Sequence, residues 1–443
     1  MAAAEDSLAQ RIRLNPTITH SEWGLILILV AIQFTHMVDF VIIMPLGGRL
    51  MRELRLDETH FAQIVSAYAW AAGIMSLLAT FVMDRFDRKT VLLVMYGGFT
   101  LSTLFCGLAE GYTLLLVSRT LAGGCGGTAA VALMAIIGDV FPPEKRGRAS
   151  GAVVSSFAVA SILGLPAGLM LAEWKGRGAP FVALAALSGL VWLLAWFQLP
   201  PIRGHLTSHR PDRWSEFLQV ISNRRYLGAF AFTLFLVLGT FSVAVFLGPY
   251  LTAINGWTEG DLSKIYFVAG CCTLLGTTII GGLADRMGRL LLFRILGSGA
   301  LAMALIVTNL APGPLWVATL AMSGFMVTAA GRMVPVQALL LGVARPENRG
   351  AFMSVNTAVQ HTATGLAPLI AGSLVSFHDD TMTGYPVVGV FAAATAGISL
   401  LLAGLLKHAP SDHSPLDAGT DLMESQKTED RFFVASREDQ HHL

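Results

Sequence analysis

The sequence carries little charge for its length. Of its 443 residues, 13% are Asp, Glu, Lys or Arg, whereas soluble domains average about 25%. The formal net charge is +1, so no bulk field recruits nucleic acid or an acidic partner. Hydrophobic residues make up 54% of the chain and the mean hydropathy is +0.63. These values predict a polytopic protein of the lipid bilayer.

Several chemical signatures are missing as well. The four cysteines lie in apolar runs and form no disulfide framework or metal-binding spacing. The stretch "GGCGG" at 123–127 has neither the preceding strand nor the following Lys-Ser/Thr of a phosphate-binding loop, so we expect it to pack two helices closely. The first twenty residues are too polar for a signal peptide. We therefore expect no metal, no nucleotide and no other cofactor.

Twelve apolar runs follow one another along the chain. Most are about 20–25 residues long, enough for a helix to cross about 30 Å of hydrocarbon. They predict an all-α membrane protein with twelve transmembrane helices. The runs are 23–47, 61–82, 90–108, 113–137, 149–172, 180–199, 226–251, 262–284, 290–311, 315–338, 351–375 and 386–406.

Basic residues predict the orientation. If both termini share one side, 22 of the 30 Lys and Arg lie on that side and six lie on the other. The positive-inside rule therefore places both termini in the cytoplasm. We expect the chain to span the inner (plasma) membrane several times. The polar, basic segment 200–225 divides the spans into six and six. The expected parts are a cytoplasmic tail (1–22), a six-helix bundle (23–199), a cytoplasmic linker (200–225), a second bundle (226–407) and a disordered cytoplasmic tail (408–443).

The two halves repeat one another. "DRFDRK" (84–89) matches "DRMGRL" (285–290), "PPEKRG" (142–147) matches "RPENRG" (345–350), and "MPLGGRLM" (44–51) matches "VFLGPYLT" (245–252). All three pairs are 201–203 residues apart and fall at equivalent places relative to the spans. This register indicates a parallel duplication, with a substrate site between the halves near the middle of the membrane.

These motifs resemble those of the major facilitator superfamily. Its loop motif, roughly G-x-x-x-D-R-x-G-R-K, fits "GGLADRMGR" in the second half, while "TFVMDRFDRK" departs from it at Thr80 and Asp87. Its fourth-span motif R-x-x-x-G is present as Arg119 and Gly123. "VDFVIIMPLG", "RMVPVQAL" and "RPENRGAFMSVNTAVQ" are most similar to the bacterial drug:proton antiporters, including arabinose-efflux-type permeases. The resemblance implies two pseudo-symmetric six-helix bundles that work by alternating access.

Charges in the cytoplasmic loops form a candidate gate. The carboxylate of Asp84 can accept hydrogen bonds from the start of span 3, and the nearby cations can pair with acids such as Glu144 or cover helix C-termini. Two interpretations stay open: a latch that holds one state of the cycle, or charges that only fix topology. The residues are Asp84, Arg85, Arg88, Glu144, Arg146, Asp285, Arg286, Arg289, Glu347 and Arg349.

Two charged residues lie inside the spans at similar depth. Asp39 is about 12 Å and Arg119 about 9 Å from the outer ends of spans 1 and 4, which the family resemblance places side by side. Because an unpaired buried charge is costly, we expect the two to pair. The pair can be a static ion pair, or Asp39 can take up a proton and release Arg119. The position equivalent to Asp39 in the second half, Thr240, carries no charge.

Other polar residues extend into the predicted cavity. His36 and Gln33 share a helical face with Asp39, and such a stripe most simply faces a wet cavity. Two interpretations of His36 stay open: a packed or hydrogen-bonded group, or a relay that takes up and releases a proton. In the second half, Arg332 either binds substrate or contacts the inner gate, and His361 is expected to form a hydrogen bond between helices. The remaining candidates are Gln337 and Gln360.

The sequence therefore predicts a proton-coupled secondary active transporter rather than an enzyme or a sensor. Export of a drug, sugar or metabolite is the first expectation. Proton-coupled uptake of a small organic anion is the second, because Arg119 and Arg332 can hold a carboxylate. In span 5, "GLPAGL" departs from the G-P-x-x-G-G stretch of efflux members, so uptake stays open. We expect a monomer whose partners are the solute, protons and lipid, with no nucleic acid.

Overall fold

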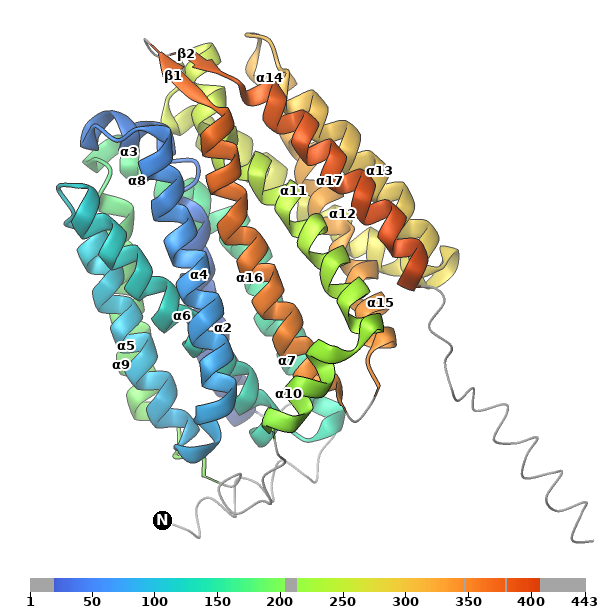
Figure 1. The fold of residues 1–443 in the computed structure, drawn as a ribbon. Helices are drawn as coiled ribbons and strands as arrows, with labels where there is room; N and C mark the ends of the chain where they lie inside the picture. The colour runs from blue at the N-terminus through green and yellow to red at the C-terminus, as the bar shows by residue number, and fades with distance from the viewer. Residues whose placement is uncertain (1–19, 204–212, 346–347, 379–380, 407–443) are drawn as a thin grey trace, which may run out of the picture.

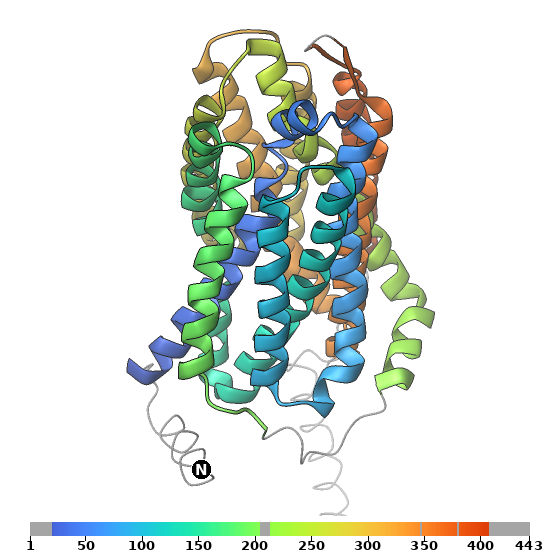
Figure 2. The ribbon, with the colours of Figure 1, turned by 90° about the vertical axis from the view of Figure 1, so that its left-hand side faces the viewer.

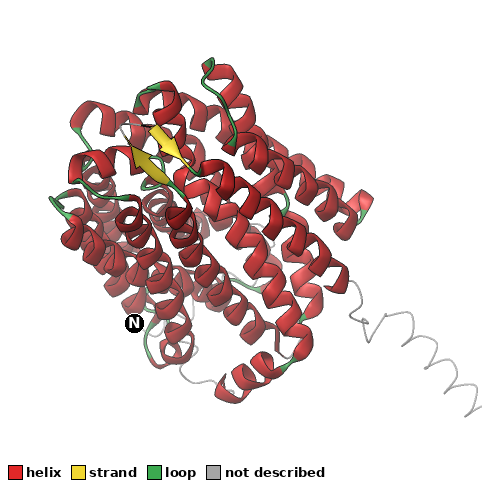
Figure 3. Cartoon of the chain, turned by 45° about the horizontal axis from the view of Figure 1, so that its top comes forward, coloured by secondary structure: helices red, strands yellow, loops and turns green. Residues whose placement is uncertain are grey.

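A computed structural model of the chain describes residues 20–203, 213–345, 348–378 and 381–406. The expected tail 408–443, almost all of the expected tail 1–22, and Glu347 lie outside these residues. The described part is almost entirely helical, with one short hairpin, as Figure 3 shows in red and yellow.

The elements follow the predicted runs closely. The first half consists of α2 (His20–Ile42), α3 (Gly47–Leu54), α4 (Glu58–Val82), η1 (Met83–Arg85), α5 (Arg88–Gly107), α6 (Tyr112–Val140), α7 (Pro143–Val159), η2 (Ala160–Gly164), α8 (Leu165–Lys175) and α9 (Ala179–Gln198). The linker holds α10 (Arg213–Ser222). The second half consists of α11 (Arg224–Asn255), α12 (Glu259–Met287), α13 (Arg289–Thr308), α14 (Leu315–Gly331), α15 (Met333–Val343), α16 (Arg349–Leu374), β1 (Ser376–His378), β2 (Thr381–Thr383) and α17 (Tyr385–Leu406).

Most of these segments can cross a membrane. Within the described residues, eleven helices are long and apolar enough to do so. The remaining expected span, 351–375, corresponds to α16, which has 26 residues but more polar side chains, among them Asn356, Gln360 and His361. Apolar side chains such as Leu275 and Leu401 are 66% and 79% exposed, as expected where lipid covers a helix.

The long helices run side by side along one axis (Figures 1 and 2). One end of the bundle carries α3 and the β1–β2 hairpin, and the other carries α10 (Figure 1); we call these the α3 end and the α10 end. Elements before and after the linker meet mainly where α4 packs against α16 and where α8 packs against α12. The division into two six-helix bundles stays a prediction.

Local sequence signals set where the helices begin. Asp57 caps α4 by accepting a hydrogen bond from the His60 amide at 2.7 Å, and Asn223 caps α11 in the same way. At the start of α12, Thr258 and Asp261 form a reciprocal capping box. These side chains satisfy amides that have no partner within the helix.

Proline marks two interruptions that the sequence predicts. Helix α2 ends at Ile42, and a turn containing Pro45 separates it from α3. Before Pro166, which lacks a backbone donor, the helix widens into a single π-turn, η2. Both breaks lie near the α3 end, where α3 and α8 then contact elements of the second half.

The "GGCGG" stretch packs helices closely, as predicted. A Cβ atom at Gly123 would overlap the Tyr68 carbonyl oxygen on α4, and one at Gly127 would lie 2.7 Å from the Ala72 carbonyl oxygen. A Cβ atom at Gly126 would lie 2.6 Å from Cδ2 of His36 on α2. Small residues on α6 thus allow α2 and α4 to approach it, which brings the polar residues of these helices together.

Candidate functional site

Asp39 on α2 and Arg119 on α6 form an ion pair in the interior of the first half. Nη1 of Arg119 lies 2.8 Å from Oδ2 of Asp39 and also donates to the Asp39 carbonyl oxygen at 3.1 Å. Both residues are 0% exposed. The matching depths, together with the family resemblance that places spans 1 and 4 side by side, correctly predict this pairing. Its role, static or moving, stays open.

Two further residues complete this pair. Thr103 on α5 donates to Oδ1 of Asp39 at 3.3 Å, and the Tyr68 ring on α4 lies 4.1 Å from the guanidinium carbon of Arg119. The ring face attracts the cation, while the Thr103 hydroxyl satisfies the second carboxylate oxygen. The sequence analysis missed both residues, because a single Thr or Tyr in an apolar span carries no signal of its own.

His36 lies beside the pair and is buried. Its ring stacks 6.3 Å from that of Tyr68 and meets Phe99 edge-on at 5.8 Å. Neither ring nitrogen has a hydrogen-bond partner within the described segments, so His36 is packed among aromatic rings. Gln33, one turn earlier, is half-buried.

The polar residues of the second half are spread over three helices. Arg332 lies between α14 and α15 and donates to the Leu236 carbonyl oxygen at 3.2 Å and to the Thr240 hydroxyl on α11. His361 on α16 packs against Gly73 on α4. It makes no hydrogen bond within the described part of the chain, so the expected hydrogen bond between helices is wrong. Gln360 is half-buried and Gln337 is exposed.

The first copy of the loop motif forms an ion-pair cluster at the α10 end. Arg88 donates to Asp84 at 2.6 Å and to Asp139, at the end of α6, at 3.0 Å. The sequence predicts that Asp84 can accept hydrogen bonds from the start of span 3. In the structure, Asp87 is the N-cap of α5, since its side chain accepts from the Lys89 amide at 2.9 Å. Asp87 also binds the start of the linker, through Arg203 at 3.0 Å.

The expected partner Glu144 is exposed and forms no ion pair within the described residues, because Asp139 occupies that role. Arg146 covers a helix end as predicted, donating to the Phe141 carbonyl oxygen at 2.8 Å. Arg85 is exposed. In the second copy, Arg286, Arg289 and Arg349 are exposed and form no ion pair among the described residues, while the Asp285 side chain and Glu347 lie outside them.

A second buried ion pair was missed altogether. Nζ of Lys145 on α7 lies 2.9 Å from Oε1 and 3.2 Å from Oε2 of Glu22 at the start of α2. Both side chains are at most 3% exposed. The sequence analysis placed Glu22 in the cytoplasmic tail and Lys145 among the loop charges. The pair therefore ties the entry of span 1 to that of span 5.

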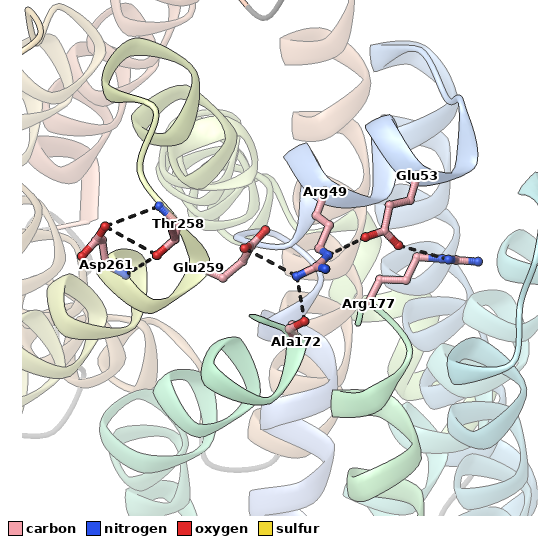
Figure 4. Close-up of polar contacts among 7 residues, drawn as sticks. All are labelled: Arg49, Glu53, Ala172, Arg177, Thr258, Glu259 and Asp261. Atoms are coloured by element: carbon pink, nitrogen blue, oxygen red, sulfur yellow. Dashed lines mark hydrogen bonds and ion pairs between the residues drawn. The ribbon is translucent and has the colours of Figure 1, made fainter. Parts of the chain in front are cut away.

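At the α3 end, Arg49 joins three elements (Figure 4). Its Nε atom lies 2.6 Å from Glu53, and Nη1 donates to the Ala172 carbonyl oxygen on α8 at 2.7 Å. Nη1 also lies 3.5 Å from Oε2 of Glu259 at the start of α12. Within the described residues, Arg49–Glu259 is the one ion pair that joins the halves on either side of the linker. The sequence predicted only that Arg49 is one of the six basic residues on the side of the membrane opposite the termini.

The other groups of this cluster fix its geometry. Arg177 donates to Glu53 at 3.1 Å and to the Ala109 carbonyl oxygen at 3.0 Å. Partial burial tends to raise the pKa of Glu53, but hydrogen bonds and positive charge from Arg49 and Arg177 outweigh burial and hold that pKa below its ordinary value. Glu259 directly follows Thr258, whose capping box with Asp261 begins α12 (Figure 4).

Comparison with known proteins identifies the class. The sequence model of the Major Facilitator Superfamily matches residues 29–331, more than half of the chain. The chain therefore belongs to this superfamily of membrane transporters.

Curated relatives support the same class. The uncharacterized MFS-type transporter YceJ of Bacillus subtilis (strain 168) is 27% identical over 81% of this chain and 91% of its own length. A probable sugar efflux transporter of Helicobacter pylori (strain P12) is 22% identical over 54% of this chain and 60% of its own length. The chain thus spans less than two thirds of the second relative.

Solved structures confirm the fold. A bacterial homolog of the human lysosomal transporter Spinster, in an inward-facing and unoccupied conformation, aligns with a TM-score of 0.69 over 89% of this chain and 100% of its own, at 16% identity. A point mutant of the nucleoside transporter NupG aligns with a TM-score of 0.70 over 86% of this chain and 99% of its own, at 15% identity. The chain is a multi-pass, all-α membrane protein with the major facilitator fold.

Proposed function

We propose that this transporter exports a small organic solute, such as a drug, sugar or metabolite, in exchange for protons. Membership of the superfamily establishes that it handles small solutes in the membrane. The export direction rests on similarity to proteins named as probable sugar efflux transporters. The proton gradient supplies the energy, with no cofactor.

The buried Asp39–Arg119 pair carries the proposal of proton coupling. The carboxylate is 0% exposed and meets the guanidinium at 2.8 Å. Removing one charge from such a pair leaves the other uncompensated, so protonation of Asp39 would change what Arg119 binds. Proton uptake and a rearrangement between α2 and α6 are thereby coupled. In the alternative, the pair is static and only stabilises the first half.

Contacts at the α3 end support alternating access. Besides Arg49–Glu259, Glu58 on α4 accepts a hydrogen bond from the Phe377 amide on β1, and Ser263 on α12 donates to the Pro166 carbonyl oxygen at 3.0 Å. All three contacts join segments on opposite sides of the linker, so they must break for a substrate site between the halves to open at this end. We place the α3 end outside the cell and both termini in the cytoplasm, on the basic-residue count, and propose that the monomer transports.

Proton-coupled uptake of a small organic anion is the second candidate. The observation that favours it is the buried Arg332, whose Nε and Nη1 atoms have no hydrogen-bond partner among the residues that the structure describes. A carboxylate would supply the missing acceptor.

Counterflow in proteoliposomes tests the class of solute, and vesicles of known orientation test the direction. The experiment loads vesicles with an unlabelled panel of sugars, cationic drugs and organic acids and measures uptake of trace label. We expect exchange with at least one compound. In everted membrane vesicles, an inside-acid gradient should drive that compound inward if the protein exports it, and an outward-directed effect would support uptake instead. Exchange with no compound and no proton movement would contradict transport.

A further inference from the structure

Arg332 occupies a polar site in the second half that the proposed proton pair does not use. It lies at the break between α14 and α15 and is 3% exposed. Its Nη2 atom donates to the Leu236 carbonyl oxygen and the Thr240 hydroxyl, both on α11.

This arrangement parallels the ion pair of the first half. Thr240 lies 201 positions after Asp39, the offset of the internal repeat. In each half, an arginine from the fourth span of that half therefore reaches the same position on its first span. Arg119 meets a carboxylate there, whereas Arg332 meets a hydroxyl.

The second site thus lacks a negative charge. Within the described residues, Arg332 forms no ion pair, and its Nε and Nη1 atoms are buried without partners. Burying a cation without an anion is costly. Arg119 differs, because Asp39 already balances its charge and only its Nε atom is buried without a partner.

Asn356 carries a further donor without a partner among the described residues, and its side chain contacts α11 at Thr233. Asn356 on α16 is 0% exposed, and its Oδ1 accepts from Thr233 at 2.8 Å. Its Nδ2 has no partner in the described part of the chain. Thr233, Leu236 and Thr240 share one face of α11. The unfilled groups at Arg332 and Asn356 are therefore all donors, and an ionised carboxylate is a group that only accepts.

We propose that Arg332 binds the carboxylate of the transported solute. This assignment rests on the proposed transport function only in naming the solute as the ligand. From the sequence, either Arg119 or Arg332 could hold a carboxylate. The structure favours Arg332, because Asp39 neutralises Arg119, whereas the charge of Arg332 has no counterpart among the described residues. Since the free nitrogens are covered in this conformation, the carboxylate enters when α11 and its neighbours part during the cycle.

Two substitutions at Thr240 test the site and leave Arg332 in place. Thr240→Asp places a carboxylate beside Arg332, as Asp39 lies beside Arg119, and Thr240→Asn is the neutral control of the same size. The assay measures thermal stability of the purified full chain with matched probes: acetate against acetamide, benzoate against benzamide, and gluconate against glucose. Sodium chloride serves as the inorganic anion arm.

We expect at least one carboxylate to raise the melting temperature of the wild type more than its neutral partner. Thr240→Asn should keep this preference. Thr240→Asp should raise the melting temperature without ligand and weaken carboxylate binding by at least about tenfold.

Three outcomes would overturn the assignment: no carboxylate stabilises the wild type more than its neutral partner, Thr240→Asp binds carboxylates like the wild type, or chloride stabilises as strongly as the best carboxylate. The transport proposal fails separately. A carboxylate that binds in this assay but shows neither counterflow nor proton movement would refute transport and leave the anion site intact.

Discussion

Arg119 donates through one nitrogen, Nη1, to both the side chain and the backbone carbonyl of Asp39, at 2.8 and 3.1 Å. The arginine thus holds the carboxylate and the α2 backbone at once. A charge change at Asp39 therefore alters both the ion pair and the contact between α2 and α6.

The stability of this pair can be measured by a double-mutant cycle. Either Asp39→Asn or Arg119→Gln leaves one buried charge unpaired, so each should lower the free energy of unfolding by about 3–5 kcal/mol. The double variant should lose less than the sum of the two. Denaturant titration in detergent micelles provides the values. Additive losses would show that the two residues do not interact.

Close packing of α6 against α4 makes a second prediction. Gly123→Ala should destabilise the protein by about 1–3 kcal/mol, because the new Cβ would overlap the Tyr68 carbonyl oxygen. Gly138→Ala on the same helix is the matched control, since no atom lies within 4 Å of its Cβ position. Thermal unfolding should leave the control unchanged or slightly stabilised. Equal losses in both variants would refute the packing argument.

The buried Lys145–Glu22 pair predicts that a substitution at Lys145 lowers stability much more than one at the adjacent Glu144. Lys145→Met removes a buried cation from the Glu22 carboxylate and should cost about 3–5 kcal/mol. The neighbouring exposed Glu144 should tolerate Glu144→Gln with a change of less than about 0.5 kcal/mol. Both can be compared by the midpoint of thermal unfolding. A harmless Lys145→Met would mean that the pair contributes no net stability.

The Arg49 cluster predicts that the stability contributed by Glu53 depends on pH. The folded-state pKa of Glu53 is below its ordinary value of 4.5, so the folded state favours the ionised form. Its contribution to stability is fully present above about pH 4.5 and is lost as the pH falls through the lowered pKa. Wild type should therefore exceed Glu53→Gln in melting temperature at pH 7, with the gap closing in acid. A gap that widens below pH 4.5 would contradict this sign.

Much of the fold could be predicted from hydropathy, since apolar runs of membrane length mark the helices and their breaks. The Asp39–Arg119 pair was predictable because charges are rare in the spans, the depths of the two residues match, and the family resemblance places spans 1 and 4 side by side. The contact between Arg332 and Thr240 could not be predicted from the internal repeat, because the first half has no arginine at the position equivalent to Arg332. Arg49–Glu259 and Lys145–Glu22 were missed for a general reason: helical periodicity gives a residue's face, while its partner depends on which distant helix packs there.

The most direct test of proton coupling compares two activities of the same variant. With a solute identified by counterflow, a pH-sensitive dye inside proteoliposomes records proton movement during transport by wild type and Asp39→Asn. We predict that Asp39→Asn retains counterflow but loses both solute-driven proton movement and accumulation driven by a pH gradient. If Asp39→Asn moves protons with solute as the wild type does, with the same pH dependence, then Asp39 is not the proton site and the pair is static.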